Sequence, residues 1–422
     1  MAMDLISSKN IFLLMRDTLK LMDKRLMTHG SRTGYILYKM LSCEGGYEKY
    51  ELADYVMLAT LHDIGAYKTD DVNDMLRFEV KKCMPHSIYG YLFMKYLSPM
   101  ANMSKVILYH HTDYAQMKDV SFEYKDIACY LHLAEMIDIH HSALGDRFDF
   151  GLLSKYSGTK YSEKAVKLFS QAQVKYDIFE QIKSKKYEEE LDELMDYIMF
   201  TNEDKRCFME MLMYCLGLRS KVKVVDSVTS ICICEQIADH MDLTEDQCTK
   251  LYYGALLHDV GMLAIPLDLL KANRKLTPEE FDIVKKHVAV QEKILTERMN
   301  QTIVDIACRH HERMDGSGYP KGLVNLQMTV EDKILQVADM MTGMISKRAY
   351  REPMSKAQVL EILHNDASRG KISMEIVDVL AADYEEIVAD VYKHSEEILT
   401  MHSKLQSQLE HVNAMFQKKA GK

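Results

Sequence analysis

The 422-residue sequence is poor in the residues that interrupt helices, and it contains no tryptophan. It has only 6 Pro and 18 Gly but 31 Met, and this balance predicts an all-α protein. No run of 18 apolar residues occurs, so we expect no membrane-spanning helix and no membrane partner. The chain does not open with a basic stretch followed by an apolar core, so a signal peptide is not expected either.

Cysteine and charge narrow the class of protein further. The 9 cysteines are odd in number and scattered, which predicts free thiols in a reducing compartment and a cytoplasmic location. Cys232 and Cys234 are expected in the core rather than at a metal. A net charge of −10 argues against DNA binding, and a hydrophobic content of 47% excludes a disordered chain.

A histidine and an aspartate stand side by side within the apolar segment Ala255–Leu263. Burying His258 and Asp259 costs free energy unless both find partners. Further ligand-type residues follow at His287, at the pair His310 and His311, and at Asp339, each within a helix-like stretch. Such a series is a much stronger signal for a site than one isolated pair.

The same series occurs once more, earlier in the chain, at His62, Asp63, His86, His110, His111 and Glu135. The step from the pair to the next histidine is 24 residues in the first copy and 29 in the second, and the following steps agree similarly. Upstream, His29 precedes His62 by 33 residues and Asp226 precedes His258 by 32. This agreement predicts a duplicated domain of roughly 200 residues.

The repeated residue types are those of a metal centre. Neighbouring side chains on a helix point about 100° apart, so an adjacent pair can serve two ions at once. Imidazole and carboxylate ligands suit Fe, Mn, Zn or Ni, and two such ions can clamp a phosphoryl group. We therefore predict two divalent transition-metal ions, Fe or Mn, in each competent site. The predicted ligands are Asp226, His258, Asp259, His287, His310, His311 and Asp339 in the second copy, and His29, His62, Asp63, His86, His110, His111 and Glu135 in the first.

Helical patterns indicate how the rest of the chain is organised. We predict a first domain over 1–175, a helical linker over 176–207, a second domain over 208–382 and a long C-terminal helix over 383–422. That last helix either packs back on the protein or forms a homodimeric coiled coil. Thr277, Pro278 and Glu280 form a helix-start signature, and the glycines of 145–160 predict a loop.

The second copy resembles the HD-GYP family of the HD-domain phosphohydrolases. The most specific part is the motif at 310–320, HHERMDGSGYP, which includes Gly318, Tyr319 and Pro320. The resemblance implies helical bundles, a metal centre in which His258 and Asp259 are the catalytic residues, and hydrolysis of a cyclic dinucleotide such as cyclic di-GMP. It also implies substrate contacts from Arg313, Gly318, Tyr319, Pro320, Arg348 and Arg351. Residues 20–170 match only the wider HD pattern.

Both copies depart from the family pattern. The family has histidine where this chain has Asp226, and a phosphate-contacting lysine where it has Met262 or, in the first copy, Ala66. Two functions therefore stay open: a metal-dependent cyclic-dinucleotide phosphodiesterase, or a catalytically impaired signalling module that binds the nucleotide or a protein. In a third interpretation, the first domain hydrolyses a different phosphate ester.

Overall fold

The computed structural model describes residues 6–69, 84–346 and 352–396, together with residues 400, 404, 407, 408 and 412. The described chain divides into two compact units. The N-terminal unit is formed by Met22–Phe208 with Lys404–Lys422, and the C-terminal unit by Met209–Ser403 with Met1–Leu21. The domain boundaries predicted from the sequence stay a prediction.

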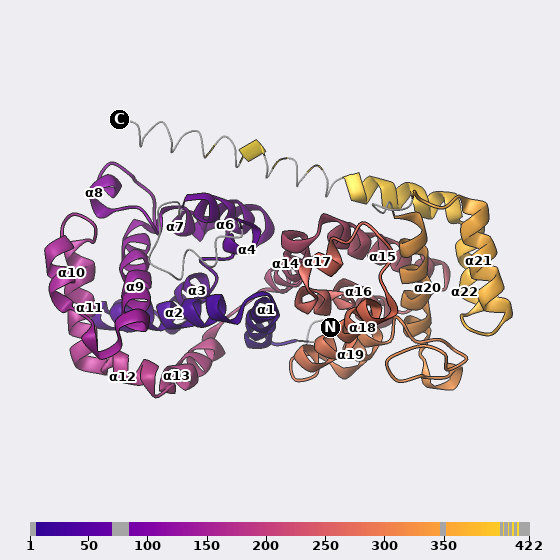
Figure 1. Ribbon diagram of the computed structural model, residues 1–422, viewed down its shortest axis with the longest axis horizontal. Coiled ribbons are helices and arrows are strands. Elements are labelled where there is room, and N and C mark those ends of the chain that lie inside the picture. Colours follow the sequence, from indigo (N-terminus) through magenta and orange to yellow (C-terminus); the bar gives the residue numbers. More distant parts are fainter. Residues whose placement is uncertain are drawn as a thin grey trace. The chain divides into compact units, whose positions relative to one another are not determined.

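The N-terminal unit is a bundle of helices in which α2 packs against α3 and α9, and α6 packs against α7 (Figure 1). Its α-helices are α2 (Lys24–Glu44), α3 (Lys49–Thr60), α4 (Ala66–Thr69), α6 (Met84–Leu97), α7 (Ser104–Tyr109), α8 (Tyr114–Met117), α9 (Lys125–Leu144), α10 (Phe150–Tyr156), α11 (Glu163–Tyr176), α12 (Ile178–Lys183) and α13 (Lys186–Leu194). Short 3₁₀ turns are η1 (Ala101–Met103), η2 (Gly145–Arg147) and η3 (Met195–Tyr197).

The C-terminal unit is a second bundle, in which α15 packs against α16 and α20. Helix α14 (Asn202–Arg219) leads into it. Its other α-helices are α1 (Ser8–Met22), α15 (Lys221–His240), α16 (Glu245–Leu257), α17 (Leu267–Leu270), α18 (Pro278–Leu295), α19 (Gln301–Cys308), α20 (Val330–Ile345), α21 (Lys356–Ser368) and α22 (Met374–Ala382). The 3₁₀ turns are η4 (Val260–Ala264) and η5 (Asn325–Gln327). Asp17 of α1 forms an ion pair of 3.2 Å with Arg298 of this unit.

The predicted all-α class is confirmed. Among the described residues there are no strands, only isolated bridges such as Asp315 with Val324. The loop expected over 145–160 is wrong in part, because η2 and α10 lie there, and Asp149 begins α10 by accepting a hydrogen bond of 2.7 Å from the Gly151 amide. Residues 384–396 are helical, and most of the long C-terminal helix lies outside the described residues.

The duplication seen in the sequence is also present in the helices. Going along the chain, α2, α3, α6, α7 and α9 of the N-terminal unit correspond to α15, α16, α18, α19 and α20 of the C-terminal unit. The predicted helix start is formed as expected: the Thr277 side chain accepts from the Glu280 amide, Glu280 accepts from the Thr277 amide, and Pro278 follows the cap. No helix in the described part of the chain has the length and apolarity needed to cross a bilayer.

In both units a glycine brings the His–Asp turn against the helix that carries the next histidine. A Cβ atom on Gly65 would lie 2.0 Å from the carbonyl oxygen of His86, and one on Gly261 would lie 2.0 Å from the carbonyl oxygen of His287. Both distances are far below any real contact. The missing side chain therefore sets the separation between the turn and the histidine helix, and it does so identically in the two copies.

Replacing Gly261 with alanine should push η4 away from α18. We expect a loss of about 1–3 kcal/mol in the free energy of unfolding, the usual cost of overfilling a packed interior, together with weaker metal binding by the C-terminal unit. Thermal and denaturant unfolding measure the first effect. Gly343→Ala is the matched control, because a Cβ there meets nothing within 4 Å. Equal stability of the two variants would contradict the argument.

Candidate metal centres

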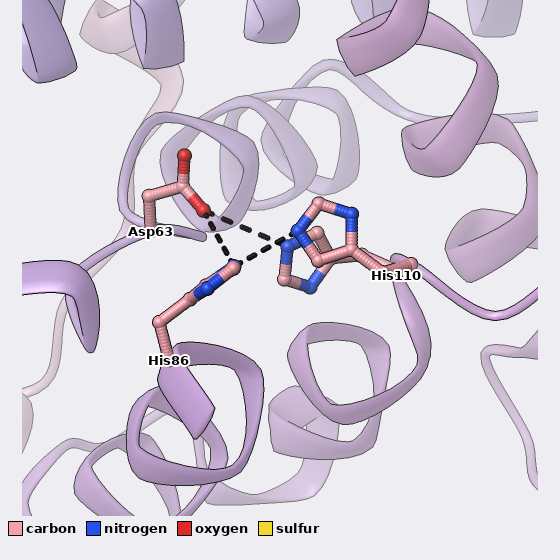
Figure 2. Close-up of side chains that lie close together, drawn as sticks. Asp63, His86 and His110 are labelled. Carbon is pink, nitrogen blue, oxygen red and sulfur yellow. Dashed lines mark hydrogen bonds and ion pairs between the residues drawn. The ribbon is translucent and has the colours of Figure 1, made fainter. Parts of the chain in front are cut away.

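In the N-terminal unit, the predicted ligands converge on the carboxylate of Asp63, which lies in the turn after α3. The Oδ1 atom of Asp63 is 3.5 Å from Nε2 of His86 and 3.6 Å from Nε2 of His110, and both rings face it (Figure 2). Its Oδ2 atom is 3.2 Å from Nε2 of His62 and 3.7 Å from Nε2 of His29. One carboxylate thus faces histidines from α2, α6 and the turns after α3 and α7.

Backbone carbonyls fix which ring nitrogen points at the centre. Nδ1 of His62 donates to the carbonyl oxygen of Ala59 at 2.6 Å, and Nδ1 of His110 donates to that of Ile107 at 2.5 Å. A nitrogen that donates here carries the proton, so Nε2 keeps its lone pair for the centre. Such outer hydrogen bonds are the usual way in which proteins orient imidazole ligands for a metal.

A buried ion pair orients the histidine on α2. Nδ1 of His29 lies 2.7 Å from Oδ2 of Asp138, and Arg32 donates to both oxygens of that carboxylate at 2.6 and 2.9 Å. Burial would raise the pKa of Asp138, but the hydrogen bonds from His29 and Arg32 lower it below its ordinary value. Asp138 is therefore an ionised carboxylate that holds Nε2 of His29 toward Asp63.

Two ligand groups in this cluster share Asp63, and His111, His132 and Glu135 form a third. The first group is His29, His62, Asp63 and Glu135, and the second is Asp63, His86, His110 and His111. Several of their buried polar atoms have no hydrogen-bond partner among the described residues, including both oxygens of Asp63, Nε2 of His62 and of His110, and Oε2 of Glu135. Unpaired buried polar atoms are costly, so the donor set fits a pair of metal ions.

Protonation states agree with a ligand role for most of the imidazoles. Burial lowers the pKa of His86 to about 3 and lowers that of His110 as well. These rings are neutral at physiological pH, which is the form that binds metals. For His62, burial lowers the pKa, but the nearby Asp63 carboxylate outweighs it and raises the value to about 9. A metal ion would replace that proton as the partner of Asp63.

The C-terminal unit repeats the arrangement less fully. His287, His310 and His311 form a ligand group, with Nε2 of His287 and of His310 3.3 Å apart. Asp259 Oδ1 is 3.8 Å from Nε2 of His287, and Asp339 Oδ2 is 3.4 Å from Nδ1 of His311. The structure thus brings these five predicted ligands together.

His258 and Asp226 complete the predicted set. Nε2 of His258 lies 3.8 Å from Oδ1 of Asp339, while its Nδ1 donates to the Ala255 carbonyl oxygen at 2.6 Å. Asp226 is buried on α15, and its Oδ1 accepts a hydrogen bond of 2.8 Å from Ser346. Asp226 is absent from the ligand group of three histidines, so its role as a metal ligand stays a prediction.

Sequence reasoning missed a lysine in this centre. Nζ of Lys223 on α15 lies 2.9 Å from Oδ2 of Asp259. Burial would lower the pKa of Lys223, but Asp259 and then Asp226 raise it above its ordinary value, so it is an ammonium ion. The pKa of Asp259 is correspondingly held well below its usual range, because Lys223 and the histidines outweigh burial. The sequence did contain one signal for Lys223, because it stands three residues before the predicted ligand Asp226.

The loop with the glycine–tyrosine–proline sequence is held over the centre by one buried glutamate. Glu312 is fully buried, and its carboxylate accepts from the Lys321 amide at 2.7 Å and the Leu323 amide at 2.9 Å. The Tyr319 ring lies 4.7 Å from the His311 ring. Gly318 is required, because a Cβ there would lie 2.3 Å from the Arg313 nitrogen. The loop therefore places Tyr319 beside the ligands.

Only some of the other residues predicted to contact substrate lie in the described part of the chain. The Arg313 guanidinium donates to the Glu312 carbonyl oxygen at 3.1 Å, and Pro320 is exposed. Arg348 and Arg351 lie outside the described residues. Their predicted contact with a substrate phosphate therefore stays a prediction.

The fold and the two clusters place histidines and carboxylates at corresponding positions of two helical bundles. Residues 210–376 match the family described as HD domain. The resemblance to an HD domain predicted from the motifs is confirmed over these residues.

Curated relatives extend the comparison beyond that segment. A 3′3′-cGAMP-specific phosphodiesterase 1 of Vibrio cholerae is 24% identical over 84% of this chain and 86% of its own length. A cyclic di-GMP phosphodiesterase of Thermotoga maritima is 35% identical over 40% of this chain and 46% of its own, so less than half of that relative is spanned. The crystal structure of a cyclic GMP-AMP-specific phosphodiesterase from V. cholerae covers 90% of this chain with a TM-score of 0.56 at 16% identity, which supports the fold.

Each central aspartate should be necessary for metal binding by its own unit. Asp63→Ala removes the carboxylate that both N-terminal ligand groups share, and Asp259→Ala removes its counterpart. We expect each variant to lose at least one metal equivalent per chain by elemental analysis, and the double variant to lose the sum of the two. The exposed Asp119→Ala is the matched control. Unchanged stoichiometry in a variant with intact helical circular dichroism would rule out that centre.

Proposed function

We propose that this chain is a metal-dependent phosphodiesterase that hydrolyses a cyclic dinucleotide, cyclic di-GMP or a related molecule, to a linear product, and that the C-terminal centre performs the reaction. The observation that carries the proposal is the convergence of His258, Asp259, His287, His310 and His311 beneath the loop that bears Tyr319. The relatives named as cyclic-dinucleotide phosphodiesterases support the substrate class.

The chain's own residues can prepare such a reaction. Bound metal ions would act as Lewis acids toward a phosphoryl group. His258, His287 and His310 each donate Nδ1 to a backbone carbonyl oxygen, at 2.6, 2.7 and 2.7 Å, so their Nε2 atoms are presented inward without reorganisation. The Tyr319 ring forms a flat wall beside His311, suited to a nucleobase or ribose.

Lys223 is our candidate for the cation that the family supplies from position 262. In the N-terminal unit the corresponding positions hold Leu26 and Ala66, which pack together in one buried apolar cluster. By the internal repeat, Lys223 and Met262 should be neighbours in the same way. A positive charge is therefore present in the C-terminal centre, although it comes from α15 and not from η4. This replacement is the reason that we favour an enzyme over a purely nucleotide-binding module.

Hydrolysis should depend on the C-terminal pair and not on the N-terminal one. We expect the metal-loaded chain to convert cyclic di-GMP or cyclic GMP-AMP to a linear product at a measurable rate. Chromatography of the reaction mixture measures this conversion. The double variant with His258→Ala and Asp259→Ala should abolish it, while His62→Ala with Asp63→Ala should retain it. Met262→Lys should raise the rate by adding the family's cation. Binding of cyclic dinucleotide without turnover, even in Met262→Lys, would leave only the signalling function.

Lys223→Gln should slow the reaction without preventing folding. One lost charge-assisted contact is worth roughly 1.5–3 kcal/mol, which is about one to two powers of ten in kcat/KM. Met262→Lys added to Lys223→Gln should restore part of that loss, because it returns a cation to the neighbouring position. Lys271→Gln is the matched control, since Lys271 is exposed. Equal kcat/KM for Lys223→Gln and the control would remove Lys223 from the account.

A further inference from the structure

A cavity of about 650 Å³ adjoins the N-terminal metal centre. Its walls include His111, which belongs to the second ligand group, and His132. The volume lies within the range of small-molecule sites, roughly 300–1,000 Å³. Neither the predicted ligand set nor the HD match over residues 210–376 accounts for this space.

The cavity is bounded by segments different from those that cover the C-terminal centre. There, the loop held by Glu312 lies beside the ligands. In the N-terminal unit, residues of α10 and of the turn that follows it line the space instead. Two backbone hydrogen bonds fix that turn: the Tyr114 amide donates to the Lys160 carbonyl oxygen at 2.9 Å, and the Ala115 amide donates to that of Thr159 at 2.8 Å. Because different segments enclose the two centres, we expect the N-terminal unit to bind a different ligand from the C-terminal unit.

His132 joins the cavity to the centre. Its Nδ1 donates to the carbonyl oxygen of His110 at 2.6 Å, which leaves Nε2 as an acceptor. That Nε2 has no hydrogen-bond partner among the described residues, although the side chain is only 4% exposed. The equivalent position in the C-terminal unit is Gln336, whose amide donates to the Glu312 carbonyl oxygen and so supports the loop. In the N-terminal unit Nε2 of His132 instead lies 3.9 Å from Oδ1 of Asp113 and close to the ligand atoms of His111 and Glu135, where a bound group can reach it.

Aromatic side chains give the cavity flat walls. Phe148 is held in place by Phe150 and Phe179, with ring centroids 5.1 Å away in both cases. Tyr161 is buried, and its ring lies 5.5 Å from that of His132. Tyr156 also lines the space and is 39% exposed. Flat rings are suited to stacking on a planar group of a ligand.

The charged groups of the cavity are of both signs. Lys160 lines it, and its positive charge lowers the pKa of His132 in addition to the larger effect of burial. The carboxylates of Asp113 and Asp149 line it as well. An ammonium suits a phosphate, and carboxylates accept hydrogen bonds from hydroxyl groups. The combination of flat walls, one cation and two acceptors matches a planar base, a sugar and a phosphate.

We propose that this cavity is a second ligand site, which binds a mononucleotide-type phosphate ester with its phosphate toward Lys160, His132 and the N-terminal metal centre and its base against the aromatic walls. The site is separate from the C-terminal centre, to which we assign cyclic-dinucleotide hydrolysis. It gives the first copy of the duplicated domain a role of its own.

Isothermal titration calorimetry of the full chain with guanosine 5′-monophosphate tests the proposal, with guanosine and inorganic phosphate as partial ligands. We expect saturable binding of the nucleotide and weaker binding of either part. Lys160→Gln should weaken nucleotide binding about ten- to a hundredfold, as expected for one lost charge-assisted contact. Tyr156→Ala should also weaken it, and this exposed position can be changed without opening the core. Cyclic-dinucleotide hydrolysis should be unchanged in both variants.

Lys167→Gln is the matched control, because Lys167 is exposed on the neighbouring helix α11 and does not line the cavity. Nucleotide binding that is equal in wild type, Lys160→Gln and Tyr156→Ala would overturn the proposal. Binding that is lost in Lys223→Gln but kept in Lys160→Gln would overturn it too, because it would place the nucleotide in the C-terminal centre. Neither result would bear on hydrolysis by that centre.

Discussion

The structure depends on a buried aspartate that needs positive charge around it. Asp63 is 1% exposed and Asp259 is 5% exposed, and burial of an unpaired carboxylate is prohibitively costly. The two units meet this requirement differently. In the N-terminal unit the described ion-pair partners of Asp63 are imidazoles, which balance its charge when they carry protons or hold a metal ion. In the C-terminal unit Lys223 supplies part of the charge from the protein itself.

Much of this could be predicted from the sequence, because ligands repeated at matching spacings must lie at matching positions of matching helices. His62, Asp63, His86 and His110 converge as predicted for that reason. Lys223 could not be predicted in the same way, since a lysine near a helix start is usually a solvated side chain and its partner Asp259 is 36 residues away. His132 was also missed, because its counterpart in the other copy is Gln336 and the repeat gives no signal there.

The segment that encloses the N-terminal centre, residues 145–160, was predicted least well. Gly145, Gly151 and Gly158 favour a loop by composition, but the Asp149 cap begins a short helix among them. What holds this segment in place is a set of contacts with distant residues, such as the backbone hydrogen bonds to Tyr114 and Ala115, which no local pattern contains. Duplication has thus preserved the ligands while the segments above them have diverged. Divergence of the cover, with retention of the ligands, is how one scaffold acquires two specificities.

The central claim is that both copies are metal centres built around their aspartates, with Lys223 as a protein-borne cation in one of them. Anomalous diffraction from crystals of the manganese-loaded full chain tests it most directly. The account predicts peaks on both sides of Asp63, and a peak at His287, His310 and His311 with the Lys223 ammonium still near Asp259. Absence of any peak beside Asp63, with the C-terminal histidines occupied, would contradict it.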